Sequence, residues 1–434
     1  MNDMERPWPH PVRAWWTVAV FTLTYVVSFV DRTVISLLIE PIKNDLGLTD
    51  IQLALLQGAA FGIFYTLMGL PLGWAADRTH RIRLITIGAA LWCLATAACG
   101  LSRTFGQLFL ARIGVGVGEA ALSPAALSTI SDLFPKERRA LPIGIYSMAV
   151  SLGAGLALLI GGAVIQLIGS SAPIELPGFG ALKVWQSTFL IVGLSGLIVL
   201  PLLATLREPE RRNELKTAVI NPPLLPYLNA NADFFARHYG GVAIYSILVS
   251  GVLAWAPAYF IRAHGWTPSE VGFRYGLVFL IFGAMGTVTA GAIAGWLQRR
   301  GVKAAALLVT GLGIALAAPP MVMAGISTDP WIALAWFALA LAFFTSPGGV
   351  AVQVLQEACP NTLRGRASAL YYFAVSIIGL TLGPLAVAWT TEAVLGDPAA
   401  VGKSLAVVAA IFAPAGGLLV LSGRKGFSRL TGEV

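Results

Sequence analysis

The sequence predicts an all-α membrane protein with twelve transmembrane helices, arranged as two pseudo-symmetric six-helix bundles. Three observations support this prediction: the apolar composition, the number of long apolar runs and a repeat that relates the two halves of the chain. Hydrophobic residues make up 57% of the 434 residues and charged residues 12%, whereas a soluble domain carries about 25% charged residues. No water-soluble core could cover so much apolar surface, so we expect a protein embedded in a membrane.

Twelve apolar runs are long enough to cross a bilayer, which takes about 20 residues of helix. The first run exceeds the length of a signal peptide and is followed by eleven others, so we expect it to be retained. The expected spans are 14–38, 51–76, 83–101, 105–133, 140–168, 187–206, 237–262, 268–298, 302–325, 330–358, 366–394 and 403–422.

The positions of Lys and Arg predict the orientation of these spans, because loops on the cytoplasmic side hold an excess of positive charge. With both termini in the cytoplasm, 21 of the 29 Lys and Arg residues fall in cytoplasmic segments and five in outer loops. We therefore expect a multi-pass protein of the cell inner membrane with cytoplasmic N- and C-termini. The net charge of +8 then reflects topology, and it predicts no nucleic-acid partner.

A polar segment over residues 207–236 divides the chain, since it is the longest polar interruption and six spans lie on each side of it. Pro222, Pro223 and Pro226 are typical of a linker. We therefore predict an N-terminal six-helix half over 1–206, a cytoplasmic linker over 207–236 and a C-terminal six-helix half over 237–434.

Three motifs of the first half recur in the second. One is a capping box, in which a Thr and a Gln or Glu three residues later exchange hydrogen bonds with the helix backbone. Because each half has six spans, the halves are expected to be parallel repeats about an axis along the membrane normal. The recurring positions are Thr49 and Gln52 with Thr267 and Glu270; Gly73, Trp74, Arg78 and Arg81 with Gly295, Trp296, Arg300 and Lys303; and Asp132, Pro135, Arg139, Tyr146, Ala149, Val150 and Ser151 with Glu357, Pro360, Arg364, Tyr371, Ala374, Val375 and Ser376.

The segment over 73–83, Gly-Trp-Ala-Ala-Asp-Arg-Thr-His-Arg-Ile-Arg, resembles the cytoplasmic signature loop of the major facilitator superfamily. It departs from the usual pattern at His80, where Gly is typical, and at Ile82, where a basic residue is typical. The resemblance implies the major facilitator fold and transport by alternating access.

The same resemblance implies a gate on the cytoplasmic side. Asp77 would face the start of the eleventh helix near Arg366, where the helix dipole favours a carboxylate, and a basic residue of the loop would pair with Asp132. These contacts would hold in one transport state and break in the other. The alternative is that the charges only anchor the topology. The residues implied in gating are Gly73, Asp77, Arg78, Arg81, Asp132, Arg139, Glu357 and Arg364.

The fifth span resembles the antiporter signature of the superfamily at four glycines. Ala157 and Leu158 stand where that signature has Gly-Pro, which weakens the case for exchange. Because small residues also let membrane helices approach closely, we interpret the four as packing residues: Gly144, Gly153, Gly161 and Gly162.

Within the superfamily, three stretches resemble the spinster group. That group implies a lysophospholipid or sphingosine phosphate as substrate, protons as the coupling ion, contact with membrane lipids and a monomer. The rival group is the anion:cation symporters of sugar acids and aromatic acids, which show a related Asp-Arg in helix one and Glu-Ala in helix four. The stretches are Phe29-Val30-Asp31-Arg32-Thr33 with Glu40-Pro41-Ile42, Gly69-Leu70-Pro71-Leu72-Gly73, and Gly116-Val117-Gly118-Glu119-Ala120.

Four ionisable residues inside the spans are the main site candidates: Asp31, Arg32, Arg112 and Glu119. An ionised side chain there costs at least a few kcal/mol, so such residues point to function. Asp31 and Arg32 diverge by about 100° on a helix, so we expect each to face another helix, with both acids lining a cavity. Glu119 or Asp31 is the predicted proton carrier, because desolvation favours a neutral carboxyl group and a nearby Arg favours the ionised form. The alternative is a fixed ion-pair network.

The two arginines are the candidate ligands of an anionic substrate, and several polar or aromatic residues accompany them with lower weight. The C-terminal half has no central carboxylate, so coupling is expected in the first half. The additional candidates are Tyr25, Ser28, Gln57, Tyr65, Tyr146 and Ser151 in the first half, and Trp255, Tyr371 and Ser376 in the second.

Other function classes have weaker support. Gly193-Leu194-Ser195-Gly196 matches the short motif of intramembrane serine proteases, but a serine nucleophile needs an adjacent base and the four His residues lie in tails, loops or helix ends. No Gly-rich Lys-Ser/Thr loop for nucleotide phosphates occurs. The three Cys residues lack metal-ligand or disulfide spacing. We therefore expect no enzyme, no catalytic residue, no cofactor and no metal.

Overall fold

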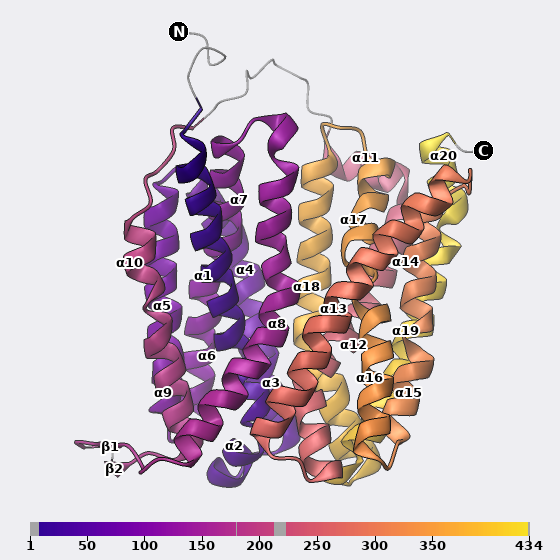
Figure 1. The fold of residues 1–434 in the computed structure, drawn as a ribbon. Coiled ribbons are helices and arrows are strands. Elements are labelled where there is room, and N and C mark those ends of the chain that lie inside the picture. The colour runs from indigo at the N-terminus through magenta and orange to yellow at the C-terminus, as the bar shows by residue number, and fades with distance from the viewer. Residues whose placement is uncertain (1–7, 179, 212–222, 433–434) are drawn as a thin grey trace. The chain divides into compact units, whose positions relative to one another are not determined.

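The computed structural model describes residues 8–178, 180–211 and 223–432, and these residues are mostly helical (Figure 1). In this part of the chain, twelve helices or helix pairs are long and apolar enough to cross a membrane, which confirms the predicted fold class. The seventh begins at Ala232, five residues before its predicted start. The spans are Pro11–Leu37, Asp50–Ala76, Arg81–Gly100, Phe105–Leu133, Ala140–Gly169, Val184–Ala204, Ala232–His264, Pro268–Arg299, Ala305–Ile326, Pro330–Ala358, Arg364–Leu395 and Pro398–Thr431.

The chain forms two compact units. The N-terminal unit comprises Met1–Thr217 and Thr267–Leu277, and the C-terminal unit comprises Ala218–Trp266 and Val278–Val434. The first turns of the eighth span therefore belong with the N-terminal unit, although they lie beyond the predicted linker.

The N-terminal unit is a helix bundle with one two-stranded hairpin, in which Glu175 pairs with Ala181 and Leu176 with Gly180. Its elements are α1 (Pro11–Leu37), α2 (Ile39–Leu46), α3 (Asp50–Gln57), α4 (Ala59–Ala76), α5 (Arg81–Gly100), α6 (Phe105–Glu119), α7 (Leu122–Leu133), η2 (Lys136–Arg138), α8 (Ala140–Gly169), β1 (Glu175–Leu176), β2 (Gly180–Ala181), α9 (Val184–Gly196) and α10 (Val199–Ala204).

The C-terminal unit is built around α12, which packs on α18 and α19. Its elements are α11 (Leu224–Ala230), α12 (Ala232–His264), most of α13 (Pro268–Arg299), α14 (Ala305–Leu316), α15 (Ala318–Ile326), α16 (Pro330–Thr345), α17 (Pro347–Ala358), α18 (Arg364–Trp389), η3 (Thr390–Leu395), η4 (Pro398–Ala400), α19 (Val401–Ser422) and α20 (Arg424–Thr431).

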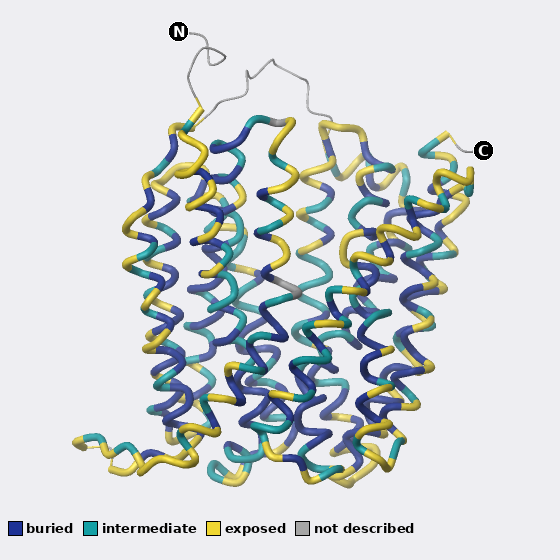
Figure 2. Tube along the Cα trace, viewed as in Figure 1, coloured by how far each residue is buried: buried dark blue, intermediate teal, exposed yellow. Residues whose placement is uncertain are grey.

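Burial differs sharply between spans (Figure 2). In the most apolar window of α12, 72% of the residues are buried, against 28% in α13. Large side chains on α13, such as Val288 at 71% exposure, face away from the protein interior. Exposed apolar side chains of this kind are expected on a membrane-spanning helix.

Several spans are interrupted at their middle, which the sequence did not predict. The second breaks at Gly58, with φ −100° and ψ −80°, and the fourth breaks at Ala120 and Ala121, directly after Glu119. Irregular backbone is tolerated at membrane depth where protein buries it. The break in the fourth span places Glu119 at the carboxyl end of α6, within the bundle.

Glycines allow the helices of each unit to pack closely. A Cβ added to Gly118 of α6 would lie 2.7 Å from the backbone N of Trp92 and 2.8 Å from the carbonyl O of Gly88, both on α5. In the C-terminal unit, a Cβ on Gly241 would lie 2.7 Å from the carbonyl O of Gly416. Small residues at membrane-helix interfaces serve this close approach.

Three of the four antiporter-like glycines of α8 lie at helix contacts, which fits the interpretation as packing residues. Gly153 lies against the Phe29 ring, and Gly161 lies against Leu37. A Cβ on Gly162 would lie 3.0 Å from the Cα of Gly272, which brings the first turns of α13 onto α8 and explains their place in the N-terminal unit.

The predicted repeat is present in local geometry as well as in sequence. In each half of the sequence, an arginine covers a tryptophan ring four residues earlier, another arginine donates to a carbonyl five residues earlier, and a threonine amide donates to a capping side chain. The matched contacts are Arg78 over Trp74 (4.2 Å) and Arg300 over Trp296 (4.1 Å), Arg139 to Phe134 (2.8 Å) and Arg364 to Cys359 (3.1 Å), and Thr49 to Gln52 (2.9 Å) and Thr267 to Glu270 (2.9 Å).

We expect Gly118→Ala to lower the free energy of unfolding by about 1–3 kcal/mol, because the added methyl group overpacks the α5–α6 contact. Thermal unfolding of the purified protein in detergent measures the effect. Gly144→Ala is the matched control, since nothing lies within 4 Å of its added Cβ. Equal melting temperatures for the two variants would contradict the role of this contact.

Candidate functional site

The centre of the candidate site is an ion pair between Arg32 of α1 and Glu119 of α6. Arg32 Nη2 lies 2.6 Å from Glu119 Oε2, and the two side chains are 19% and 1% exposed. Arg32 thus faces another helix rather than Asp31, its neighbour in sequence. The other oxygen, Glu119 Oε1, is buried and has no hydrogen-bond partner among the described residues.

Three aromatic rings surround the Arg32 guanidinium, and we call them the aromatic cage. The guanidinium carbon lies 4.9 Å from the ring centroid of Phe29, 4.5 Å from that of Phe61 and 4.9 Å from that of Tyr65. Cation–π attraction at such distances contributes roughly 0.5–2 kcal/mol each, the upper value applying to desolvated groups. The cage therefore stabilises a positive charge that remains partly exposed.

Tyr25 and Tyr146 extend this aromatic surface from α1 to α8. Their rings are stacked with centroids 5.1 Å apart and planes 17° apart. Tyr25 also contacts Phe29 of the cage at 5.4 Å, and the Tyr146 hydroxyl lies 3.3 Å from Ser123 Oγ. Predicted site residues from three different spans thus form one continuous surface with Arg32.

Arg112 differs from its predicted role as a substrate ligand. Its side chain is 0% exposed, and its guanidinium lies 3.3 Å from the carbonyl O of Asp31, 3.5 Å from that of Arg32 and 3.4 Å from that of Leu56. Leu56 lies just before the helix break at Gly58. In this structure, Arg112 ties α6 to the backbones of α1 and α3, and a substrate could not reach it without displacing these bonds.

Asp31 is also oriented differently from the prediction, which had it facing a cavity together with Glu119. Asp31 is 0% exposed, and its Oδ2 lies 3.7 Å from the position of a Cβ on Gly196 of α9. Neither carboxylate oxygen has a hydrogen-bond partner that meets geometric criteria, although the Trp92 indole is close by. Adjacent helix residues diverge by about 100°, so turning Arg32 to Glu119 turns Asp31 toward α5 and α9.

The remaining substrate candidates have varied surroundings. Ser28 is buried and its hydroxyl donates to the Tyr25 carbonyl (3.0 Å), whereas Gln57 Nε2 is buried without a partner among the described residues. The Ser151 side chain lies outside the described part of the chain. In the C-terminal unit, Trp255 is 0% exposed and donates to the Pro384 carbonyl (3.0 Å), which is the geometry of a packing residue.

Two further candidates belong to the C-terminal unit. Tyr371 is 4% exposed and stacks on His238, with ring centroids 5.9 Å apart. Ser376 is half-buried. Contact of Tyr371 and Ser376 with the substrate remains a prediction.

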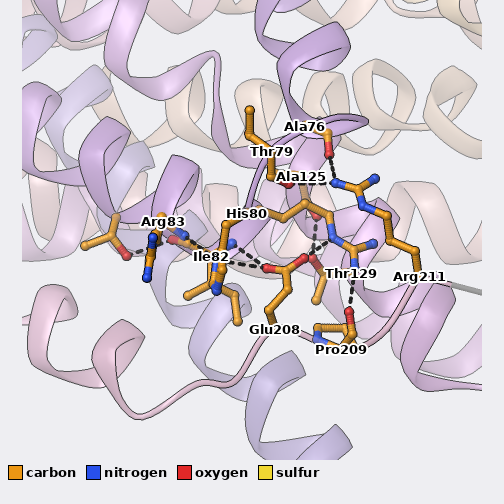
Figure 3. Close-up of polar contacts among 12 residues, drawn as sticks. Ala76, Thr79, His80, Ile82, Arg83, Ala125, Thr129, Glu208, Pro209 and Arg211 are labelled. Atoms are coloured by element: carbon orange, nitrogen blue, oxygen red, sulfur yellow. Dashed lines mark hydrogen bonds and ion pairs between the residues drawn. The ribbon is translucent and has the colours of Figure 1, made fainter.

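The signature loop and the segment that follows α10 form a second polar cluster (Figure 3). Arg81 is fully buried, forms an ion pair with Asp132 of α7 and donates to Ser128 Oγ at 3.1 Å. Arg81 is thus the basic partner that the resemblance implied for Asp132. Its Nε also lies 2.5 Å from Glu208 Oε1.

Glu208 is a residue that the sequence reasoning missed, because it lies in the segment assigned to the linker. Its other oxygen accepts from the Ile82 amide at 3.0 Å. Two nearby residues complete the contact: the Pro209 carbonyl accepts from Arg81 Nη2 (3.0 Å), and Arg211 donates to the Ala76 carbonyl (2.7 Å). In the sequence, the only signal for this role of Glu208 was an acidic residue shortly after the sixth span.

The other predicted gating residues make contacts within their own units. Asp77 caps α4, and a Cβ added to Gly73 would lie 3.8 Å from the Cβ of Pro124. Glu357 accepts from Gln298 (3.0 Å) and Gln353 (2.8 Å), where its repeat partner Asp132 accepts from arginine. The implied approach of Asp77 to Arg366 would join the two units and remains a prediction.

Among the described residues, no group of three or more His, Cys, Asp and Glu is placed to hold a metal ion. The Ser195 hydroxyl donates to the Val192 carbonyl of its own helix at 3.0 Å.

Comparison with known proteins bears directly on this geometry. The sequence profile of the Major Facilitator Superfamily matches residues 21–384. An MFS-type efflux pump of Mycolicibacterium smegmatis is 28% identical over 403 residues, covering 92% of this chain and 90% of the relative. A probable L-galactonate transporter of Escherichia coli is 26% identical over 305 residues, covering 66% and 63%. The crystal structure of a bacterial homolog to the human lysosomal transporter Spinster has a TM-score of 0.81 and 25% identity, with 98% of each chain covered.

Removing one charge of the Arg32–Glu119 pair is expected to cost more stability than removing both. A single loss leaves an uncompensated buried charge, at about 3–5 kcal/mol, and the cost should be larger for Arg32→Gln, because Glu119 is the less exposed partner. Unfolding in detergent of both single variants and the double variant, analysed as a double-mutant cycle, measures the coupling. Additive effects would argue against a mutually dependent pair.

Proposed function

This chain belongs to the Major Facilitator Superfamily, and from that premise we propose that it is a transporter of the spinster type, which moves an amphipathic anion together with protons. The proposed substrate class is a lysophospholipid or sphingosine phosphate. The observation that carries the proposal is Arg32, a partly exposed guanidinium held between an aromatic cage and Glu119.

The anionic head group would bind Arg32. A guanidinium presents several N–H donors in a planar fork that matches phosphate and carboxylate oxygens. Arg32 Nη2 donates a hydrogen bond to Glu119, and Arg32 Nε has no hydrogen-bond partner among the described residues. The guanidinium therefore keeps donors for a second anion.

The apolar part of the substrate would lie on the aromatic surface. Tyr25, Tyr146, Phe29 and Tyr65 are joined by ring contacts or by their contact with Arg32. Binding pockets for small molecules are mostly apolar, with a few polar groups that fix orientation. One arginine beside several rings fits a ligand that has one charged end and an apolar body.

Proton coupling would follow from competition for Arg32. When the substrate anion takes the guanidinium, Glu119 loses its counter-charge while remaining buried, and an unpaired buried carboxylate is costly unless it takes up a proton. Substrate and proton would thus bind with positive coupling. Asp31, which is buried without a hydrogen-bond partner, would be the second proton carrier in the same unit.

A second candidate function is proton-coupled symport of small organic anions. The similarity to a probable L-galactonate transporter favours it, and Arg32 could bind a sugar-acid carboxylate by the same donors. In this case the rings would contact the sugar ring rather than an acyl chain. Transport assays must separate the two substrate classes.

The remaining features of the proposal follow from topology and fold. The protein would reside in the cell inner membrane as a monomer, with both termini cytoplasmic. The two units, as parallel repeats, would move against each other in alternating access. The energy would come from the proton gradient.

We expect purified protein in liposomes to move protons when a lysophospholipid is added, and not when galacturonate is added. Glu119→Gln and Asp31→Asn should each reduce this flux by about tenfold or more, which corresponds to about 1.4 kcal/mol. A pH-sensitive dye inside the vesicles records the flux, with protein-free vesicles as the leak control. Asp50→Asn is a matched variant, because Asp50 is a buried acid paired with Lys43 away from the site (2.5 Å).

Each outcome of this assay decides a separate point. Flux with galacturonate alone would establish the organic-anion symporter in place of the lipid transporter. Unchanged flux in both site variants would reduce Asp31 and Glu119 to structural charges.

Arg32→Lys is expected to raise the substrate concentration for half-maximal flux by about tenfold. Lysine keeps the charge but loses the planar fork and the ring stacking, so the Glu119 pair would survive while recognition of the anion weakens. The measurement is the dependence of flux on substrate concentration. An unchanged half-maximal concentration would show that Arg32 does not touch the substrate.

A further inference from the structure

His80 stands at the start of α5 with one ring nitrogen between two partners. Its Nδ1 lies 3.3 Å from the backbone N of Arg83 and 3.2 Å from Glu208 Oε2. The first contact caps α5, whose first amides have no partners within the helix. The second contact reaches a carboxylate on the segment that follows α10.

These two contacts require opposite states of the same nitrogen. To accept from the Arg83 amide, Nδ1 must carry a lone pair; to donate to Glu208, it must carry a proton. The neutral ring with its proton on Nε2 can therefore cap the helix, but it places the Nδ1 lone pair against a carboxylate oxygen. The protonated ring can pair with Glu208 but gives up the cap.

Glu208 begins a four-residue segment, 208–211, that we call the strap. Figure 3 shows the strap lying on the signature loop. Glu208 accepts from Arg81 Nε (2.5 Å) and from the Ile82 amide (3.0 Å), and Arg211 donates to the carbonyls of Ala76 (2.7 Å) and Thr79 (2.6 Å). The strap thus fixes both ends of the loop between α4 and α5.

The charged groups around His80 are of both signs. Arg81 is the one buried cation of the cluster that these contacts define, and it pairs with two carboxylates, those of Asp132 and Glu208. A proton on His80 would balance the second carboxylate. The other charged groups of the neighbouring segments are Asp77, Arg78 and Arg83 on the loop and the start of α5, and Glu210 and Arg211 on the strap.

We propose that His80 and Glu208 form a proton-binding site separate from the intramembrane carboxylates. Proton uptake would turn His80 from the Arg83 amide to Glu208 and hold the strap more tightly on the signature loop. A histidine side chain ordinarily changes charge between about pH 5 and pH 8, so the site would respond to the pH of the predicted cytoplasmic face. Its effect on transport, slower turnover at acidic cytoplasmic pH, rests on the proposed function.

A cysteine in the strap tests the site without any transport measurement. Pro209 is buried, so a thiol in Pro209→Cys would react with a polar maleimide only when the strap lifts. The three native cysteines are buried, and the parent protein without the new cysteine gives the background. His80→Asn is the matched variant, because asparagine can still accept from the Arg83 amide but cannot take a proton.

The labelling rate of Pro209→Cys is divided by that of the same variant with His80→Asn. This ratio cancels the pH dependence of the thiol itself. We expect this ratio to fall about two- to fivefold between about pH 8 and pH 6, as suits a partly exposed ion pair. Glu208→Gln should abolish the fall. A ratio that stays constant with pH, or a fall that persists in Glu208→Gln, would overturn the proposal whether or not the protein transports lipid.

In liposomes, we acidify only the cytoplasmic face and measure turnover. The unmodified protein should slow about two- to fivefold more than His80→Asn, because the same partly exposed ion pair sets the size of the effect. Turnover that slows equally in the two proteins, together with a pH-dependent labelling ratio, would support the proton-binding site and contradict its effect on transport.

Discussion

The N-terminal unit keeps the positive charge of Arg32 inside an apolar bundle. An isolated charge there costs free energy. Three features offset this cost: the Glu119 carboxylate at 2.6 Å, the rings of the aromatic cage and the partial exposure of the guanidinium. The helix break after Glu119 places this carboxylate at the carboxyl end of α6.

The two units use the same local motifs but differ in charge. Asp132 pairs with a buried arginine, whereas its repeat partner Glu357 accepts from two glutamine amides. Arg32 and Glu119 likewise belong to the N-terminal unit.

The sequence located part of the candidate site and left part of it incomplete, for identifiable reasons. It identified Arg32 and Glu119 because ionised residues are rare in apolar spans. It predicted that Asp31 lines a cavity and that Arg112 binds substrate, because it gave no rotation for either helix. In the structure, Arg112 binds main-chain carbonyls and Asp31 turns toward α9. Glu208 could not be identified, since an acid in a polar linker resembles any exposed charge.

The sequence by itself determined the twelve spans, the internal repeat, the capping boxes and the family. These depend on composition, spacing and hydrogen bonds within a few residues, all of which are written along the chain. Only the tertiary structure decided the aromatic cage, the breaks within spans, the environment of Asp31 and the strap on the signature loop. Apart from the breaks, each of these joins side chains far apart in sequence, such as His80 and Glu208. Their contact depends on how neighbouring helices rotate and pack, which no local pattern encodes.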